Sequence, residues 1–150
     1  MSQAVHAVVM HRFGFSAERV FDACLDPAWV GRWMFGPNVR EERVVRLAIE
    51  PRVGGKFTFV VERQGKEIQH FGKYLEIDRP SLLAFTWATQ EAASDVSRVT
   101  IEISARDEGC DVKLTQVMGA QWSEFVDKAA SSWSKMLDVL EQVILEDAKI

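Results

Sequence analysis

The sequence has few cysteines and no long hydrophobic run. Its two cysteines, Cys24 and Cys110, are far apart and sit among apolar neighbours. Two buried thiols are typical of a protein of the reducing cytosol rather than of a disulfide-stabilised scaffold. No stretch approaches the roughly 20 apolar residues of a membrane-spanning helix, and the first residues lack the basic segment and apolar run of a signal peptide. We therefore expect a cytoplasmic protein that does not insert into membranes.

An excess of positive charge is also missing. The chain has 18 Lys and Arg against 22 Asp and Glu, which gives a net charge of −4 at neutral pH. Nucleic acids and anionic membranes are usually bound through clustered positive charge, so the composition predicts neither as a partner. Hydrophobic residues make up 47% of the 150 positions, which is enough for one well-packed core. We expect residues 1–150 to form a single domain.

Histidines are scarce, and their spacing offers no metal site. His6, His11 and His70 form no HExxH motif, and no cysteine pair has zinc-site spacing. His6 and His11 are five residues apart on one predicted strand, so their side chains point to opposite faces of the sheet. We expect no bound metal.

Motifs for nucleotide binding and for nucleophilic catalysis are absent too. Gly54-Gly55-Lys56 is followed by a phenylalanine in a strand context, whereas a P-loop needs serine or threonine and a helix. There is no GxSxG elbow, and neither cysteine has a basic neighbour in sequence. The sequence therefore predicts no cofactor.

The N-terminal part predicts one strand and two short helices. Residues 3–13 alternate loosely and are rich in valine, which favours a strand. Ser16 is a suitable N-cap for the helix that follows. Asp26 and Pro27 provide the cap and the first residue of a second helix.

Beyond the two helices, apolar residues recur at every second position, which predicts strands. Short separators rich in Gly, Pro and Asp indicate hairpins, and hence an antiparallel meander. The six further strands are predicted at residues 44–50, 56–62, 67–77, 82–87, 96–105 and 110–118.

A long amphipathic helix is predicted for residues 123–146, with Ser123 as its N-cap. It is the only long element that could cover the apolar face of the sheet. The predicted fold class is therefore α+β: a curved antiparallel sheet wrapped around a long C-terminal helix, with two short N-terminal helices at one open end.

Several segments resemble the START-like, helix-grip (SRPBCC) superfamily. More narrowly, they are similar to its branch homologous to the activator of the heat-shock protein 90 ATPase. The resemblance runs from about Arg12 to Leu145 and is carried by residues 16–37, 53–59, 72–87, 97–103 and the Trp-bearing C-terminal helix.

The resemblance implies a hydrophobic cavity between the sheet and the C-terminal helix. Members of the superfamily bind lipids, sterols, polyketides and plant hormones, and a minority are cyclases or aromatases. Chaperone-activating relatives carry an additional N-terminal domain for which this chain has no room, which speaks against a true co-chaperone role. The main hypothesis is therefore the binding of a small hydrophobic or amphipathic ligand, with a stress-related role as one variant of it.

We expect the cavity to be lined by apolar side chains of the sheet and of the C-terminal helix. The predicted lining residues are Phe57, Phe59, Tyr74, Phe85, Trp87, Ile101, Leu114, Met118, Ala129, Trp133, Met136 and Leu137.

Two alternatives to simple ligand binding stay open. The first is an enzyme of the cyclase or aromatase type with His70 or Tyr74 as acid or base. These two side chains share a face of one strand with Glu76, but alternation alone does not decide whether that face points inward. Gly72 between them could bring a ligand or the long helix close to the backbone.

The second alternative is a chaperone-accessory module that binds another protein. Its best candidate surface is the segment 33–37, WMFGP, with Phe35 at its centre. In the competing interpretation, Trp33 and Phe35 plug the open end of the sheet. An edge strand could also pair two copies of the chain into a homodimer.

Overall fold

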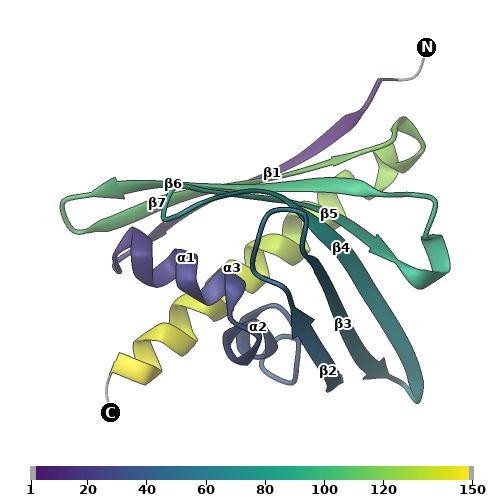
Figure 1. The fold of residues 1–150 in the computed structure, drawn as a ribbon, viewed down its shortest axis with the longest axis horizontal. Helices are drawn as coiled ribbons and strands as arrows, with labels where there is room; N and C mark the ends of the chain where they lie inside the picture. Colours follow the sequence, from purple (N-terminus) through teal and green to yellow (C-terminus); the bar gives the residue numbers. More distant parts are fainter. Residues whose placement is uncertain (1–2, 149–150) are drawn as a thin grey trace.

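The computed structural model describes residues 3–148, in which seven antiparallel strands form one curved sheet (Figure 1). The strands follow the order β1-β7-β6-β5-β4-β3-β2, so β2 to β7 form a meander and β1 lies against β7. Strands β1 and β2 are the two edges of the sheet. Their bounds are β1 (Val5–Phe13), β2 (Arg43–Ile49), β3 (Lys56–Arg63), β4 (Lys66–Asp78), β5 (Leu82–Thr89), β6 (Ser97–Arg106) and β7 (Gly109–Met118).

The two N-terminal helices begin at the predicted caps. The Ser16 hydroxyl accepts a hydrogen bond from the Arg19 N–H (3.1 Å) at the start of α1 (Ala17–Leu25). The Asp26 carboxylate accepts one from the Ala28 N–H (2.9 Å) at the start of α2 (Pro27–Trp33). Each cap satisfies a backbone donor that the first turn of a helix leaves unpaired.

The C-terminal helix α3 (Val126–Ala148) begins later than the sequence predicts, so the proposed Ser123 cap is wrong. A 3-10 helix, η2 (Ala120–Phe125), precedes it, and Trp122 inside η2 has non-helical backbone angles. Trp122 packs against the buried side chains of Ala7, Met118 and Ala129. Tertiary packing of this large ring thus outweighs the helical propensity of the segment.

Helix α3 crosses the concave face of the sheet diagonally, and α1 and α2 lie beside it (Figure 1). Its 23 residues correspond to about 35 Å, enough to cross the whole domain. The apolar face of the sheet and the apolar stripe of α3 form the core, whose fully buried members include Leu83, Ile101, Leu114, Leu137, Leu140 and Ile144. The predicted fold class is confirmed.

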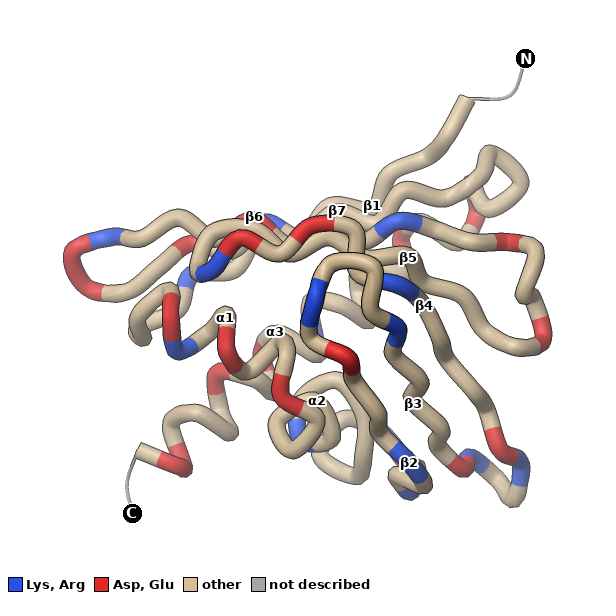
Figure 2. Tube along the Cα trace, in the orientation of Figure 1, with Lys and Arg blue, Asp and Glu red and all other residues tan. Residues whose placement is uncertain are grey.

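In the described part of the chain, charged residues of both signs are interspersed along the backbone trace, without a long segment of one sign (Figure 2). None of the helices in residues 3–148 is long and apolar enough to cross a membrane.

Candidate ligand cavity

A cavity of about 520 Å³ lies between the sheet and the N-terminal half of α3. Its apolar wall includes Phe35, Trp87, Met118, Ala129, Trp133 and Met136. At its rim, η2 faces the connection between β5 and β6, which contains the short 3-10 helix η1 (Gln90–Ala92). One hydrogen bond spans this rim, from Gln121 Nε2 to Asp95 Oδ1 (3.3 Å).

Five of the twelve predicted lining residues border this cavity: Trp87, Met118, Ala129, Trp133 and Met136. The other seven, Phe57, Phe59, Tyr74, Phe85, Ile101, Leu114 and Leu137, are buried in the core and do not border it.

Aromatic packing explains why the cavity does not reach those residues. Phe57 stacks on Phe59 with ring centroids 4.7 Å apart and meets Phe85 edge-on at 5.5 Å. These rings, with Tyr74, fill the space between the sheet and the helices at that point. The cavity beside Trp133 therefore does not extend along the interface between the sheet and α3 to these rings.

Two polar residues on the wall were not predicted from the sequence, Ser97 and Gln116. Trp133 Nε1 donates to Gln116 Oε1 (2.8 Å), Gln116 Nε2 donates to Ser97 Oγ (3.0 Å), and Ser97 Oγ donates to the Trp87 carbonyl (3.1 Å). This series of hydrogen bonds gives each of these buried polar groups a partner and holds the indole of Trp133 at the wall.

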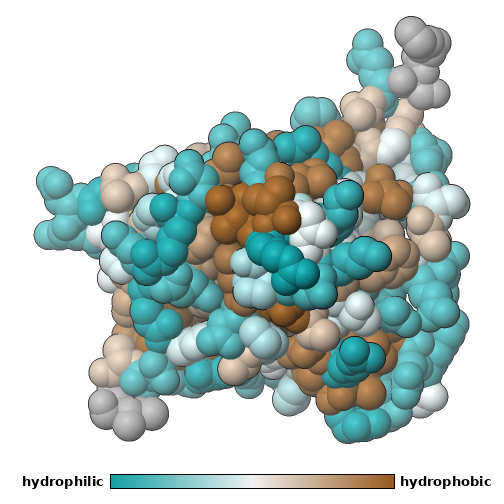
Figure 3. Space-filling view, in the orientation of Figure 1, coloured by the Kyte–Doolittle hydropathy of each residue, from teal (hydrophilic) through white to brown (hydrophobic). Residues whose placement is uncertain are grey.

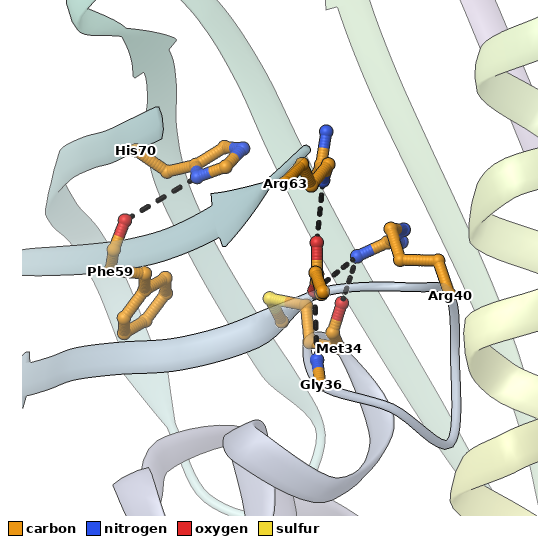
Figure 4. Close-up of polar contacts among 7 residues, drawn as sticks. Met34, Gly36, Arg40, Phe59, Arg63 and His70 are labelled. Carbon is orange, nitrogen blue, oxygen red and sulfur yellow. Dashed lines mark hydrogen bonds and ion pairs between the residues drawn. The ribbon is translucent and has the colours of Figure 1, made fainter. Parts of the chain in front are cut away.

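His70 is buried, 6% exposed, and borders the cavity. Its ring lies between Phe35 (centroids 4.8 Å apart) and Trp87 (5.4 Å). Its Nδ1 donates a long hydrogen bond to the Phe59 carbonyl (3.4 Å), so in the neutral ring Nε2 carries the lone pair (Figure 4). Burial lowers the pKa of His70 from its ordinary value of 6.5 to about 4, so the ring is neutral at pH 7.

Tyr74 also points inward, but it packs among Phe57, Phe85 and the core and does not reach the cavity. Burial raises the pKa of its hydroxyl well above the usual range. A bulge between Tyr74 and Glu76 then reverses the alternation of β4, so that Glu76 is exposed and Ile77 packs against the core.

Gly72 makes room for an aromatic ring of the protein itself. A Cβ at this position would clash with the Thr86 carbonyl and lie 2.5 Å from Phe57 Cζ. The backbone approach that the sequence suggested for a ligand or the long helix is therefore made by Phe57, the partner of Gly72 across β3 and β4.

A buried carboxylate, that of Glu42, joins the two arginines of the cavity lining, Arg40 and Arg63, whose hydrogen bonds are drawn in Figure 4. Its side chain is fully buried, 0% exposed. Oε1 accepts from Arg63 Nε (2.5 Å), and Oε2 accepts from Arg40 Nη1 (2.9 Å) and from the Gly36 N–H (2.8 Å). Both arginines border the cavity. Glu42 and Arg40 lie in a loop without strand or helix periodicity, and no sequence signal marked this cluster.

The thiols offer no nucleophile. Burial raises the pKa of Cys24 to about 12 and that of Cys110 to about 11. Both are free cysteines, and neither borders the cavity.

The segment proposed as an exposed protein-binding surface is buried instead. Trp33, Met34 and Phe35 are 0–3% exposed. Trp33 Nε1 donates to the Ala23 carbonyl (3.0 Å), and Phe35 forms part of the cavity wall. Large exposed hydrophobic side chains lie elsewhere, at Val8, Met10, Val45, Val53, Val96, Phe125 and Leu145. In space-filling view, one face has hydrophobic side chains gathered near its middle within hydrophilic surroundings (Figure 3).

A curved antiparallel sheet that grips a long C-terminal helix, with two short helices after the first strand, defines the START-like, helix-grip class of proteins. Within that class, the family described as "Activator of Hsp90 ATPase homolog 1-like protein" matches residues 15–144. The chain belongs to this family, which confirms the resemblance noted in the sequence.

Solved structures with the same fold come from several bacteria. A protein of unknown function from Staphylococcus aureus is 16% identical, with a TM-score of 0.86 and coverage of 99% of this chain and 98% of that one. A protein from Nitrosomonas europaea is 14% identical, with a TM-score of 0.83 and 97% coverage of both chains. A protein from Chromobacterium violaceum is 20% identical, with a TM-score of 0.75 and 95% coverage of both. At such identities the likeness establishes the fold and not the function. No curated protein matches the chain.

Proposed function

We propose that the protein binds a small amphipathic ligand in the cavity between the sheet and α3. The observation that carries this proposal is a space of about 520 Å³ whose lining combines apolar and aromatic side chains with polar groups such as His70, Ser97 and Gln116. Ligand sites have this combination, in which apolar walls provide affinity and a few polar groups fix orientation.

The aromatic side chains support a ligand with a flat or chain-like apolar body. Phe35 and Trp87 lie nearly parallel, 12° apart, and Trp133 meets Trp87 edge-on with centroids 5.6 Å apart. Met118 and Met136 add flexible surface that adapts to the shape of a guest. His70 Nε2 provides an acceptor for a hydroxyl or amide donor of the ligand.

A catalytic role for His70 is the second candidate, and its support is that the imidazole borders the cavity. A general base works best when its pKa lies near the working pH. A pKa of about 4 makes the His70 ring a weak base. We therefore rank binding above catalysis, and Tyr74, which is outside the cavity, is not a candidate for contact with the guest.

The neutral fluorescent probe N-phenyl-1-naphthylamine tests the proposed site. We expect saturable binding with enhanced emission, and a rise in melting temperature with probe concentration because the probe binds only the folded chain. Native mass spectrometry of freshly purified protein adds a search for a retained guest.

A matched pair of variants on α3 assigns the probe to this cavity. Ser132 borders the cavity, whereas its neighbour Ser131 is exposed and does not. Ser132→Leu fills part of the space, so the probe should bury less apolar surface when it binds. We expect its affinity to fall at least about tenfold, which corresponds to a loss of about 1.4 kcal/mol in binding free energy. Ser131→Leu should leave binding unchanged. Equal affinities for both variants, or no probe binding by the unmodified protein, would overturn the proposal.

Cytoplasmic location and dimer formation belong to the same proposal. The two free, buried thiols support a reducing compartment. Pairing through the edge strand β1 or β2 stays a prediction that the molecular mass in solution can test.

A further inference from the structure

The positive charges around Glu42 outnumber the negative ones. One carboxylate meets two guanidinium groups, and both of its oxygens are already occupied, Oε1 by Arg63 and Oε2 by Arg40 and the Gly36 N–H. Glu42 is buried and saturated with donors, so it cannot compensate further charge. One positive charge therefore remains at this part of the cavity lining.

Both arginines have donors to spare. Arg63 donates to Glu42 through Nε, and no acceptor among residues 3–148 meets its two Nη atoms. Arg40 uses Nη1 for Glu42 and for the Met34 carbonyl (3.1 Å). The arginine side chains are 33% and 24% exposed, respectively, and both border the cavity. Figure 4 shows the Arg63 guanidinium extending beyond its contact with Glu42.

Other charges on the lining do not cancel this excess. Lys128 is a further cation at the cavity, and Asp95 is the one acidic residue on the described lining. Asp95 lies at the exposed rim and already accepts from Gln121. His70 contributes no charge at neutral pH, because burial holds its pKa at about 4. This part of the cavity lining thus has cationic donors without acceptors, close to the aromatic ring of Phe35.

We infer that the cavity selects ligands with an anionic group, of which a carboxylate is the simplest, and that Arg63 and Arg40 bind this group while the apolar body lies against Trp87, Trp133 and Met136. This inference rests on the proposed function and adds the chemical class of the ligand. Guanidinium groups suit carboxylates because their N–H donors match the two oxygens. Such contacts strengthen where water is partly excluded.

A matched pair of competitors separates this inference from the proposed function. Octanoate and 1-octanol share one alkyl chain and differ at the head group. Each is titrated against the protein saturated with N-phenyl-1-naphthylamine, and displacement gives the ratio of the two affinities. We expect octanoate to bind about tenfold tighter than 1-octanol, the usual value of a charge-assisted hydrogen bond. The ratio should fall with added salt, because exposed charges are screened.

Variants assign the preference to the arginines. Arg63→Gln should reduce the affinity ratio to near unity, whereas Arg63→Lys, which keeps the charge, should retain much of it. Glu42→Gln removes the compensating carboxylate and should raise the ratio. Opposite changes in Arg63→Gln and Glu42→Gln distinguish ligand contact from a merely structural role, which would weaken both competitors together.

Arg98→Gln is the matched control. Arg98 pairs with Glu76 at 3.1 Å on the outer face of the sheet and does not border the cavity, so its loss should leave the ratio unchanged. If Arg63→Gln does not fold, Arg63→Lys and Glu42→Gln still test the direction.

Each outcome has one meaning. Equal displacement by octanoate and 1-octanol would overturn the inference and leave the proposed function standing. A preference for octanoate that persists in the double variant Arg40→Gln/Arg63→Gln would overturn the assignment to these residues. If the probe binds and neither competitor displaces it, the inference also fails. Failure of the probe itself to bind would remove both proposals.

Discussion

The two halves of α3 face the same sheet with opposite results. In the C-terminal half, Leu137, Leu140 and Ile144 are 0–1% exposed and belong to one hydrophobic core with residues of the sheet, α1 and α2. In the N-terminal half, Ala129 and Ser132 are small, and the wall opposite has polar side chains at Ser97 and Gln116. Branched side chains interdigitate to crystal-like density, whereas small and polar ones leave room. The comparison teaches that one amphipathic helix can complete a packed core where its side chains are large and apolar, and leave a cavity where they are small or face polar groups.

Leu140→Ala should have the largest effect and tests the closed half. Leu140 is 0% exposed, so truncation should lower the free energy of unfolding by about 4 kcal/mol through lost burial and the cavity that remains. Met136→Ala is the comparison in the open half, where the side chain already borders free space, and we expect about 2 kcal/mol. Urea unfolding measures both, and equal losses would contradict the contrast between the halves.

The burial of neutral His70 at the cavity predicts that the free energy of unfolding depends on pH. Its folded pKa of about 4 lies below the ordinary 6.5, so between these values the unfolded chain binds a proton that the folded chain does not. The stabilising contribution is complete above pH 6.5 and is lost as the pH falls to 4, by about 3 kcal/mol.

His70→Phe removes this titration and keeps an aromatic ring beside Phe35 and Trp87. The free energy of unfolding of the unmodified protein should therefore decline by about 3 kcal/mol relative to that of His70→Phe between pH 6.5 and 4. Parallel pH profiles for the unmodified protein and His70→Phe would show that His70 is not buried in its neutral form.

Gln116→Leu should have a smaller effect and tests the polar wall. It leaves the Trp133 N–H without its acceptor and removes the donor to Ser97, which should cost about 2 kcal/mol. The indole N–H resonance of Trp133 should also shift. Gln121→Leu on the exposed rim should change the free energy of unfolding by no more than about 0.5 kcal/mol. A loss for Gln116→Leu no larger than that of the control would mean that the hydrogen-bond chain adds nothing.

Alternation and capping residues were enough to predict the fold, because both encode local geometry. The strand limits, the Ser16 and Asp26 caps and the apolar face all follow from spacing along the chain. The start of α3 was missed because Trp122 turns the chain for reasons of tertiary packing.

The cavity was predicted only in part. Gln116 and Ser97 have the same parity as their buried neighbours Leu114 and Val99, so polar residues in apolar register were a readable signal. The bulge after Tyr74 could not be read, because a reversed alternation requires knowledge of the partner strand. Nor could the cluster around Glu42, because Gly36, Arg40 and Glu42 lie in an irregular loop and Arg63 joins them from β3 only in the folded chain.

The tryptophans at the cavity give the protein its own optical reporter. Of the five tryptophans in the sequence, Trp87, Trp122 and Trp133 border the cavity, whereas Trp29 and Trp33 lie away from it. Because indole emission responds to the polarity of its surroundings, replacement of water by a guest shifts the intrinsic spectrum. Occupancy can therefore be followed without a label, and Trp133, which is tied to Gln116 by its N–H, reports from a fixed orientation.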